Sequence, residues 1–247
     1  MNTITILWLR QLKRYFRSKS RIIGSLAQPL LFLVVFGFGF GPIFQKAGAG
    51  NYMQFLVPGI IAMSILFTSI FTGIEIIWDK QFGFLKETLV APVSRLEIMT
   101  GRTLGGATVA VIQGLIVLAL SFIIGFRPSI TMLPIALVFM ILTALLFTAL
   151  GTAIASLLDD MQGFQLIMNF LIMPIFFLSG ALFPLEGLPA IVKVITQIDP
   201  LTYGVDGLRD ALIGGGVFSV TTNLTILVIL TAALLAIGSY LFSKIEI

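Results

Sequence analysis

The sequence predicts an all-α integral membrane protein with six transmembrane helices, and composition and run length both support this class. Of its 247 residues, 58% are hydrophobic and 11% are charged, whereas a soluble domain carries about 25% charged residues. So few polar side chains could not cover the surface of a water-soluble fold. Apolar runs of roughly 20 residues, the length that a helix needs to cross a bilayer, recur along the chain. A soluble fold is therefore excluded.

Residues 1–21 are predicted to form an amphipathic helix that lies in the plane of the membrane surface. Its apolar side carries Ile4, Trp8, Leu12, Tyr15 and Phe16, and its cationic side carries Arg10, Lys13, Arg14 and Arg17. The cationic side would face the anionic headgroups of the lipid bilayer. The alternative is a disordered basic tail that serves only as a topogenic signal. The helical spacing of the aromatic residues favours the helix.

Six apolar runs are predicted to span the bilayer. They comprise residues 22–44, 55–78, 103–126, 131–158, 164–183 and 222–242. The first run exceeds the apolar core of a signal peptide, roughly 7–15 residues, so we expect it to be retained. With the N-terminus inside, the cytoplasmic segments contain eleven Lys and Arg residues and the outer segments contain four. This excess places both termini in the cytoplasm.

The loop 79–102 is unusually polar, since seven of its 24 residues are charged. It also contains apolar side chains that would cost solubility in the cytosol unless a partner covers them. Phe82, Leu85 and Leu89 share one face of a short helix that ends before Pro92. We interpret this face as a helix that docks in a groove of a partner, oriented by the charges at Lys86, Glu87, Arg95 and Glu97. Alternatively, these residues lie on the bilayer or on neighbouring spans.

The outer segment 184–217 is too polar to span the membrane and too apolar for a plain loop. One apolar stripe is formed by Ile191, Val194, Ile195 and Ile198, and a second by Leu201, Val205, Leu208 and Leu212. The stripes are separated by Asp199-Pro200, and the second ends before three consecutive glycines. They predict two short helices that dip into the outer leaflet or cap the bundle.

Motifs for catalysis are missing from the sequence. There is no Walker A motif for ATP, and a chain without His or Cys lacks the usual general base, thiol nucleophile and soft metal ligands. We therefore expect no catalytic residue, no metal site and no cofactor bound by this chain. Six of the fifteen basic residues precede the first span, as in a cytoplasmic flank, so the net charge of +4 does not indicate nucleic-acid binding.

Glu75 is the one acid inside a predicted span. An intramembrane carboxylate is a candidate functional group, so Glu75 could relay a proton or a cation. Alternatively, it lies one helical turn from Trp78 and Asp79 and reaches interfacial water. We favour the second interpretation, because an acid close to the interface costs little free energy.

Three stretches resemble the permease subunits of ABC-2 type transporters, most closely their daunorubicin-resistance and nodulation-export branch. They are FGFLKETLVAPVSRLEI at 82–98, FLSGALFPLEGLP at 177–189 and DPLTYGVDGLR at 199–209. With the six spans, they extend the resemblance over nearly the whole chain. One departure is Phe84, where many relatives have Thr.

The resemblance implies a homodimeric channel paired with two copies of a separate cytosolic ATPase, which would bind ATP and Mg²⁺. It implies that the loop after the second span forms a coupling helix, here roughly 83–90, that inserts into the ATPase. The docking residues would be Phe82, Gly83, Leu85, Lys86, Glu87, Leu89, Pro92 and Arg95. The N-terminal helix would also touch the ATPase, and the outer helices would be re-entrant and cap the exit.

We therefore expect residues 1–247 to form a single transmembrane domain of an exporter in a prokaryotic cytoplasmic membrane. Phe-rich spans with few buried charges favour a lipophilic or amphiphilic cargo such as a drug or a lipid. Two alternatives stay open: an ion-coupled secondary exporter that uses Glu75, and a membrane scaffold or insertase.

Overall fold

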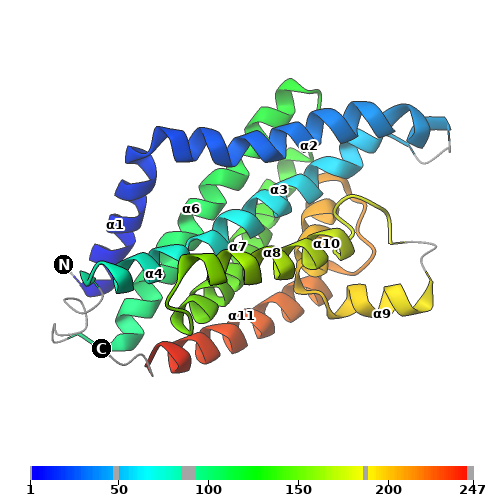
Figure 1. Ribbon diagram of the computed structural model, residues 1–247. Coiled ribbons are helices and arrows are strands. Elements are labelled where there is room, and N and C mark those ends of the chain that lie inside the picture. Colours follow the sequence, from blue (N-terminus) through cyan, green and yellow to red (C-terminus); the bar gives the residue numbers. More distant parts are fainter. Residues whose placement is uncertain (1, 47–49, 85–92, 186–188, 244–247) are drawn as a thin grey trace.

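The computed structural model describes residues 2–46, 50–84, 93–185 and 189–243. Figure 1 shows long helices side by side in one bundle, with α1 running crosswise at one end. In chain order the elements are α1 (Thr3–Arg17), α2 (Lys19–Lys46), α3 (Tyr52–Phe71), α4 (Ile74–Gln81), α6 (Arg95–Ile123), η1 (Ile130–Met132), α7 (Leu133–Ser156), α8 (Met161–Leu178), α9 (Ala190–Ile198), α10 (Pro200–Ile213) and α11 (Val220–Ser243). The described part of the chain is thus a helical bundle.

Six helical segments are long and apolar enough to cross a bilayer, which confirms the predicted number of spans within the described ranges. They are Lys19–Lys46, Tyr52–Gln81, Arg95–Ile123, Ile130–Ser156, Met161–Leu178 and Val220–Phe242. The second span consists of α3 and α4, which are separated by a break at Thr72 and Gly73. A side chain at Gly73 would overlap the backbone of Gly151, so this break packs directly against α7.

The third span begins eight residues earlier than the apolar run predicts, so the polar loop is shorter than 24 residues. Helix α6 starts at Arg95 because Ser94 caps it: the Ser94 hydroxyl accepts from the Glu97 N–H at 3.2 Å, and the Glu97 carboxylate accepts from the Ser94 N–H at 3.1 Å. This reciprocal capping box satisfies two backbone donors. The connection between α4 and α6 is therefore 82–94, which we call the α4–α6 segment.

Helix α3 occupies the centre of the bundle. Every residue from Leu56 to Leu66 is buried, and α3 packs against α2, α6, α7 and α10. A helix that is apolar on all sides is typical of such a central position. Helices α2, α8 and α11 instead bury few of their residues within the bundle. Their exposed apolar side chains are available for contact with lipid.

The two ends of the bundle differ. Helix α1, the last turn of α4 and the last turn of α11 lie at one end, which we call the α1 end, and α9 and α10 lie toward the other, the α10 end (Figure 1). Helices α9 and α10 correspond to the two helices predicted within 184–217. The Asp199 side chain caps α10, and Gly214 ends it with a φ of 70°, which glycine adopts readily. Helix α10 is almost wholly buried, whereas the apolar stripe of α9 is exposed.

Candidate docking and coupling site at the α1 end

The α4–α6 segment begins with an exposed aromatic side chain. Phe82 is 68% exposed, and Gly83 has a φ of 78°, a left-handed conformation that ends α4. Arg95 opens α6 directly after the Ser94 cap. The remaining predicted docking residues, Leu85, Lys86, Glu87, Leu89 and Pro92, lie outside the described residues, as does most of the predicted coupling helix. The docking role of this segment stays a prediction.

Asp79 connects three helices at the start of this segment. Its carboxylate accepts from Arg10 of α1, with Nη2 and Oδ1 3.0 Å apart, and from Nη2 of Arg102 in α6. Asp79 and Arg102 are each 4% exposed. We expected both residues in a loop that faces water, and this expectation is wrong. A buried ion pair is costly to break from one side, so these contacts hold the ends of α1, α4 and α6 together.

Glu75 lies one turn before Asp79 on the same face of α4 and has two arginine partners. Its Oε1 is 2.9 Å from Nη1 of Arg21, and its Oε2 is 3.5 Å from Nη1 of Arg14. Glu75 is 6% exposed, so the interpretation that it reaches interfacial water is wrong. Within the described ranges no group of three or more acidic side chains comes together to hold a metal ion. Glu75 instead joins α4 to the junction of α1 and α2.

Helix α1 confirms the predicted N-terminal helix, although its apolar side packs on α6. Gly101 and Gly105 give it room, because a side chain at either position would crowd Leu7 or Gln11. The Trp8 indole donates to the Thr108 hydroxyl at 3.0 Å. The Tyr15 hydroxyl donates to the Gln113 carboxamide at 2.6 Å, a buried contact, and burial raises the pKa of Tyr15.

The observed faces of α1 differ in part from the predicted apolar and cationic sides. Phe16 is 58% exposed and does not pack on α6, whereas Leu7, which was not assigned to the apolar side, is buried against α6. Arg10 and Arg14 face the acids of α4, whereas Lys13 and Arg17 are exposed. The signal was present in the sequence as matched spacing: Arg10 and Arg14 are four residues apart, as are Glu75 and Asp79, so each pair lies on one helix face.

Lys80 links α4 to a fourth helix. Its ammonium group lies 2.8 Å from the Ser156 carbonyl, 3.0 Å from the Leu158 carbonyl and 3.2 Å from the Asp159 carboxylate. A lysine in this position satisfies the free carbonyls at the C-terminus of α7. The last turn of α4 is therefore bound to α1, α6 and α7, and any force on the α4–α6 segment acts on all four helices.

Comparison with known proteins identifies relatives for most of the chain. The model of the ABC-2 type transporter family matches residues 2–213. The chain is 29% identical over 201 residues to nodulation protein J of Rhizobium leguminosarum bv. trifolii, which covers 81% of this chain and 76% of that protein. It is 26% identical over 230 residues to the inner membrane transport permease YadH of Escherichia coli K12, which covers 92% and 89%.

A third relative is the transport permease ycf38 of Cyanophora paradoxa, 30% identical over 196 residues. That match covers 76% of this chain and 66% of the relative. The family match includes α1, both helices that flank the α4–α6 segment, and α10. The site at the α1 end is thus inside the matched region.

Proposed function

Because this chain belongs to the ABC-2 type transporter family, we propose that it is the permease subunit of an exporter whose separate cytosolic ATPase docks on the α4–α6 segment. The family consists of membrane components of ABC transporters, which implies an ATPase partner. The observation that carries the proposal is the buried ion-pair set at Asp79, which joins α4, α6 and α1 where this segment begins.

The mechanism follows from how the segment is attached. Closure of two ATPase subunits on ATP would displace the segments that they hold. Because Asp79 joins α4 to α6 and α1, and Lys80 joins α4 to α7, these helices would shift as a rigid body. Packed interfaces have discrete arrangements, so a small displacement at one end can change the packing along the whole span.

The proposed assembly contains two copies of this chain and two ATPase subunits, with the α1 end in the cytoplasm. The exposed apolar faces of α2, α8 and α11 are the surfaces from which a homodimer interface would be drawn. The excess of basic residues at the α1 end supports the orientation. The cargo of this exporter would be lipophilic or amphiphilic, since the spans contain few charges.

The structure gives no support to the ion-coupled alternative. Glu75 is in contact with Arg14 of α1 and Arg21 of α2. Its position instead suits a residue that orients α4 against α1 and α2.

The docking proposal is tested by introducing charge into the predicted apolar face of the segment. Leu85→Asp together with Leu89→Asp should abolish co-purification of the ATPase, because a buried unpaired carboxylate is strongly unfavourable. Membrane insertion should be unchanged. The matched control is Leu157→Asp, which is exposed in the connection between α7 and α8. Undiminished co-purification of the double variant would remove the docking claim.

A further inference from the structure

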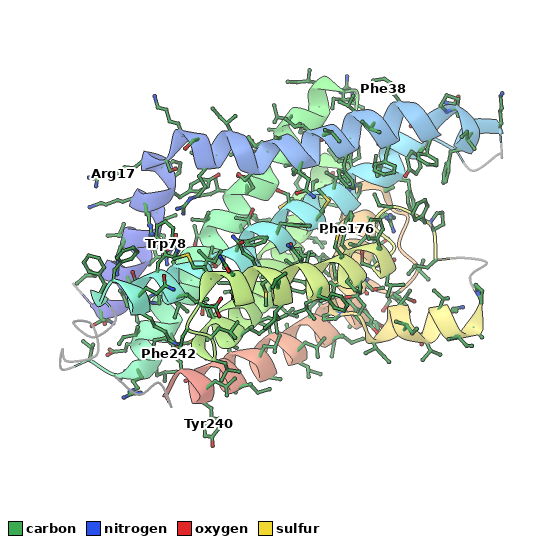
Figure 2. The ribbon with its side chains drawn as sticks, viewed as in Figure 1. Arg17, Phe38, Trp78, Phe176, Tyr240 and Phe242 are labelled. Carbon is green, nitrogen blue, oxygen red and sulfur yellow. The ribbon has the colours of Figure 1, made fainter. Side chains whose placement is uncertain are left out.

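A basic groove lies in the corner formed by α1, the first turn of α2 and the end of α4. Its volume is about 1160 Å³. Six cationic residues line it: Arg10, Lys13, Arg14, Arg17, Lys19 and Arg21. Figure 2 shows Arg17 pointing outward near the junction of α1 and α2. Trp78 of α4 is labelled in the same region. Among the described residues, Asp79 is the only acid in its lining.

Within the described residues, the groove carries positive charge that no acidic side chain pairs with. Arg10 pairs with Asp79, and Arg14 and Arg21 share Glu75. Lys13, Arg17 and Lys19 are exposed, and within the described ranges none of them forms an ion pair. Three cations that form no ion pair with a described residue line the same groove, and together they favour binding of an anion.

A second cavity continues from the groove into the bundle. Its volume is about 370 Å³, within the range of roughly 300–1,000 Å³ that is usual for ligand sites. Most of its lining surface is apolar and comes from residues such as Met63, Phe67 and Val109. Polar side chains, among them Gln11, Gln28 and Glu75, also line it. Arg14, Arg21 and Trp78 line both hollows, so the charged groove and the apolar cavity adjoin.

This combination matches one kind of ligand. A charged headgroup fits the groove, and an attached hydrocarbon chain fits the apolar cavity beside it. The apolar cavity lies between α2 and α3, both of which belong to membrane spans. A cavity between two membrane spans is reached by the hydrocarbon chain of a lipid, whereas a water-soluble partner would bind outside the spans. Basic residues near a membrane surface attract anionic lipids.

We propose that this corner binds an anionic membrane lipid. Its phosphate contacts Lys13, Arg17 and Lys19, and an acyl chain enters the cavity between α2 and α3. The site belongs to the chain itself and does not depend on ATPase docking. Because the lipid would contact α1 and α2 beside the Glu75 and Asp79 ion pairs, it would hold α1 in place against α4.

The two tryptophans of the chain provide the assay. Trp78 lines both hollows, and Trp8 is bonded to Thr108 on α6. In a Trp8→Phe background, Trp78 is the only tryptophan and reports on the site. The full chain is reconstituted in phosphatidylcholine nanodiscs that contain a small fraction of brominated lipid. Brominated phosphatidylglycerol should quench Trp78 more than brominated phosphatidylcholine does at the same fraction.

Two variants test the two parts of the site. Arg17→Gln with Lys19→Gln should weaken the apparent affinity for phosphatidylglycerol by roughly 25-fold, since each basic residue near a membrane surface contributes roughly fivefold. The matched control is Lys46→Gln with Lys193→Gln, which removes the same charge outside the groove and should leave the lipid preference unchanged.

Gly24→Leu should abolish the excess quenching, because the new side chain would fill the cavity. Gly24 has open space around it. Gly39→Leu on the same helix, also in open space, is its control.

Equal quenching by the two brominated lipids would overturn the proposal. An unchanged phosphatidylglycerol preference in Gly24→Leu would also overturn the proposal. It would mean that the basic residues attract the lipid headgroup at the surface and that no acyl chain enters the cavity. Loss of the preference on addition of inorganic phosphate, compared with chloride at equal ionic strength, would assign the groove to a free anion. If the Arg17 and Lys19 variant kept its lipid preference but lost ATPase co-purification, the groove would be a protein contact instead.

Discussion

The two ends of the bundle bury charged side chains in different ways. At the α1 end, buried charges pair with each other across helices, as Asp79 does with Arg102. At the α10 end, the buried charges of α10 bond mainly to the backbone. Asp206 accepts from the Val217 N–H at 2.7 Å and the Phe218 N–H at 2.9 Å, and Arg209 donates to the Gly180 carbonyl at 2.9 Å.

This difference has a mechanical consequence. The ion pairs at the α1 end join helices to one another, so these helices can move together as one unit. A side chain that satisfies backbone groups cannot leave without exposing unpaired N–H and C=O groups, which are costly in a buried position. We therefore interpret the α10 end as a fixed anchor and the α1 end, beside the proposed docking segment, as the region built to move.

The largest effect is expected at the anchor. Asp206→Leu with Arg209→Leu should lower the free energy of unfolding by about 4 kcal/mol or more, because several buried backbone groups lose their partners. Thermal unfolding in detergent, followed by circular dichroism, measures this. Should the double variant fail to fold, Asp206→Asn keeps one acceptor and should show an intermediate loss. A double variant as stable as the wild type would refute the anchor interpretation.

Removal of the buried pair Asp79 and Arg102 at the α1 end should affect stability differently from removal of Asp206 and Arg209. Asp79→Leu alone should cost about 3–5 kcal/mol, since it leaves Arg102 buried without its acid. Adding Arg102→Leu should recover most of that loss, because the two side chains chiefly satisfy each other and an apolar pair can replace them. The same unfolding measurement applies. Failure of the second substitution to recover stability would show that the two ends do not differ as described.

A smaller, pH-dependent effect is expected at Asp199, between α9 and α10. Burial raises its pKa to about 7, opposed in part by the bond from the Leu201 N–H at 2.9 Å. Because the folded-state pKa exceeds the unfolded value, the associated stability is present at low pH and is lost as the pH rises toward 7. The loss should be about 2 kcal/mol between pH 5 and 7. Asp199→Asn keeps the cap and should flatten this dependence; an unchanged slope would exclude Asp199 as its origin.

The sequence predicts the spans well because hydropathy reports on lipid contact directly. The six spans and the pair α9 and α10 follow from apolar runs and helical stripes. The start of α6 does not, because Arg95 and Arg102 interrupt the apolar run. The Ser94 capping box was the available signal for that start, and the pairing of Arg102 with Asp79 explains how a charged residue stays helical and buried.

The contacts between elements could not be predicted from one sequence. The aromatic spacing of α1 indicates a helix but does not indicate that it packs on α6. This packing depends on two glycines of α6, Gly101 and Gly105. Asp206 and Arg209 lie three residues apart within an apolar stripe and were not singled out, because their partners are backbone groups distant in sequence. The docking residues at 85–92 were predicted from an apolar helix face, its flanking charges and the family resemblance, and they remain a prediction.

The central claim is that ATP hydrolysis by a separate subunit drives this permease through the α4–α6 segment. The most direct measurement is transport of a lipophilic dye in vesicles that contain the chain and its co-purifying ATPase. Transport should require ATP, persist when the proton gradient is dissipated, and be lost in Leu85→Asp with Leu89→Asp. Transport by the chain without the ATPase, lost with the proton gradient and in Glu75→Gln, would contradict it.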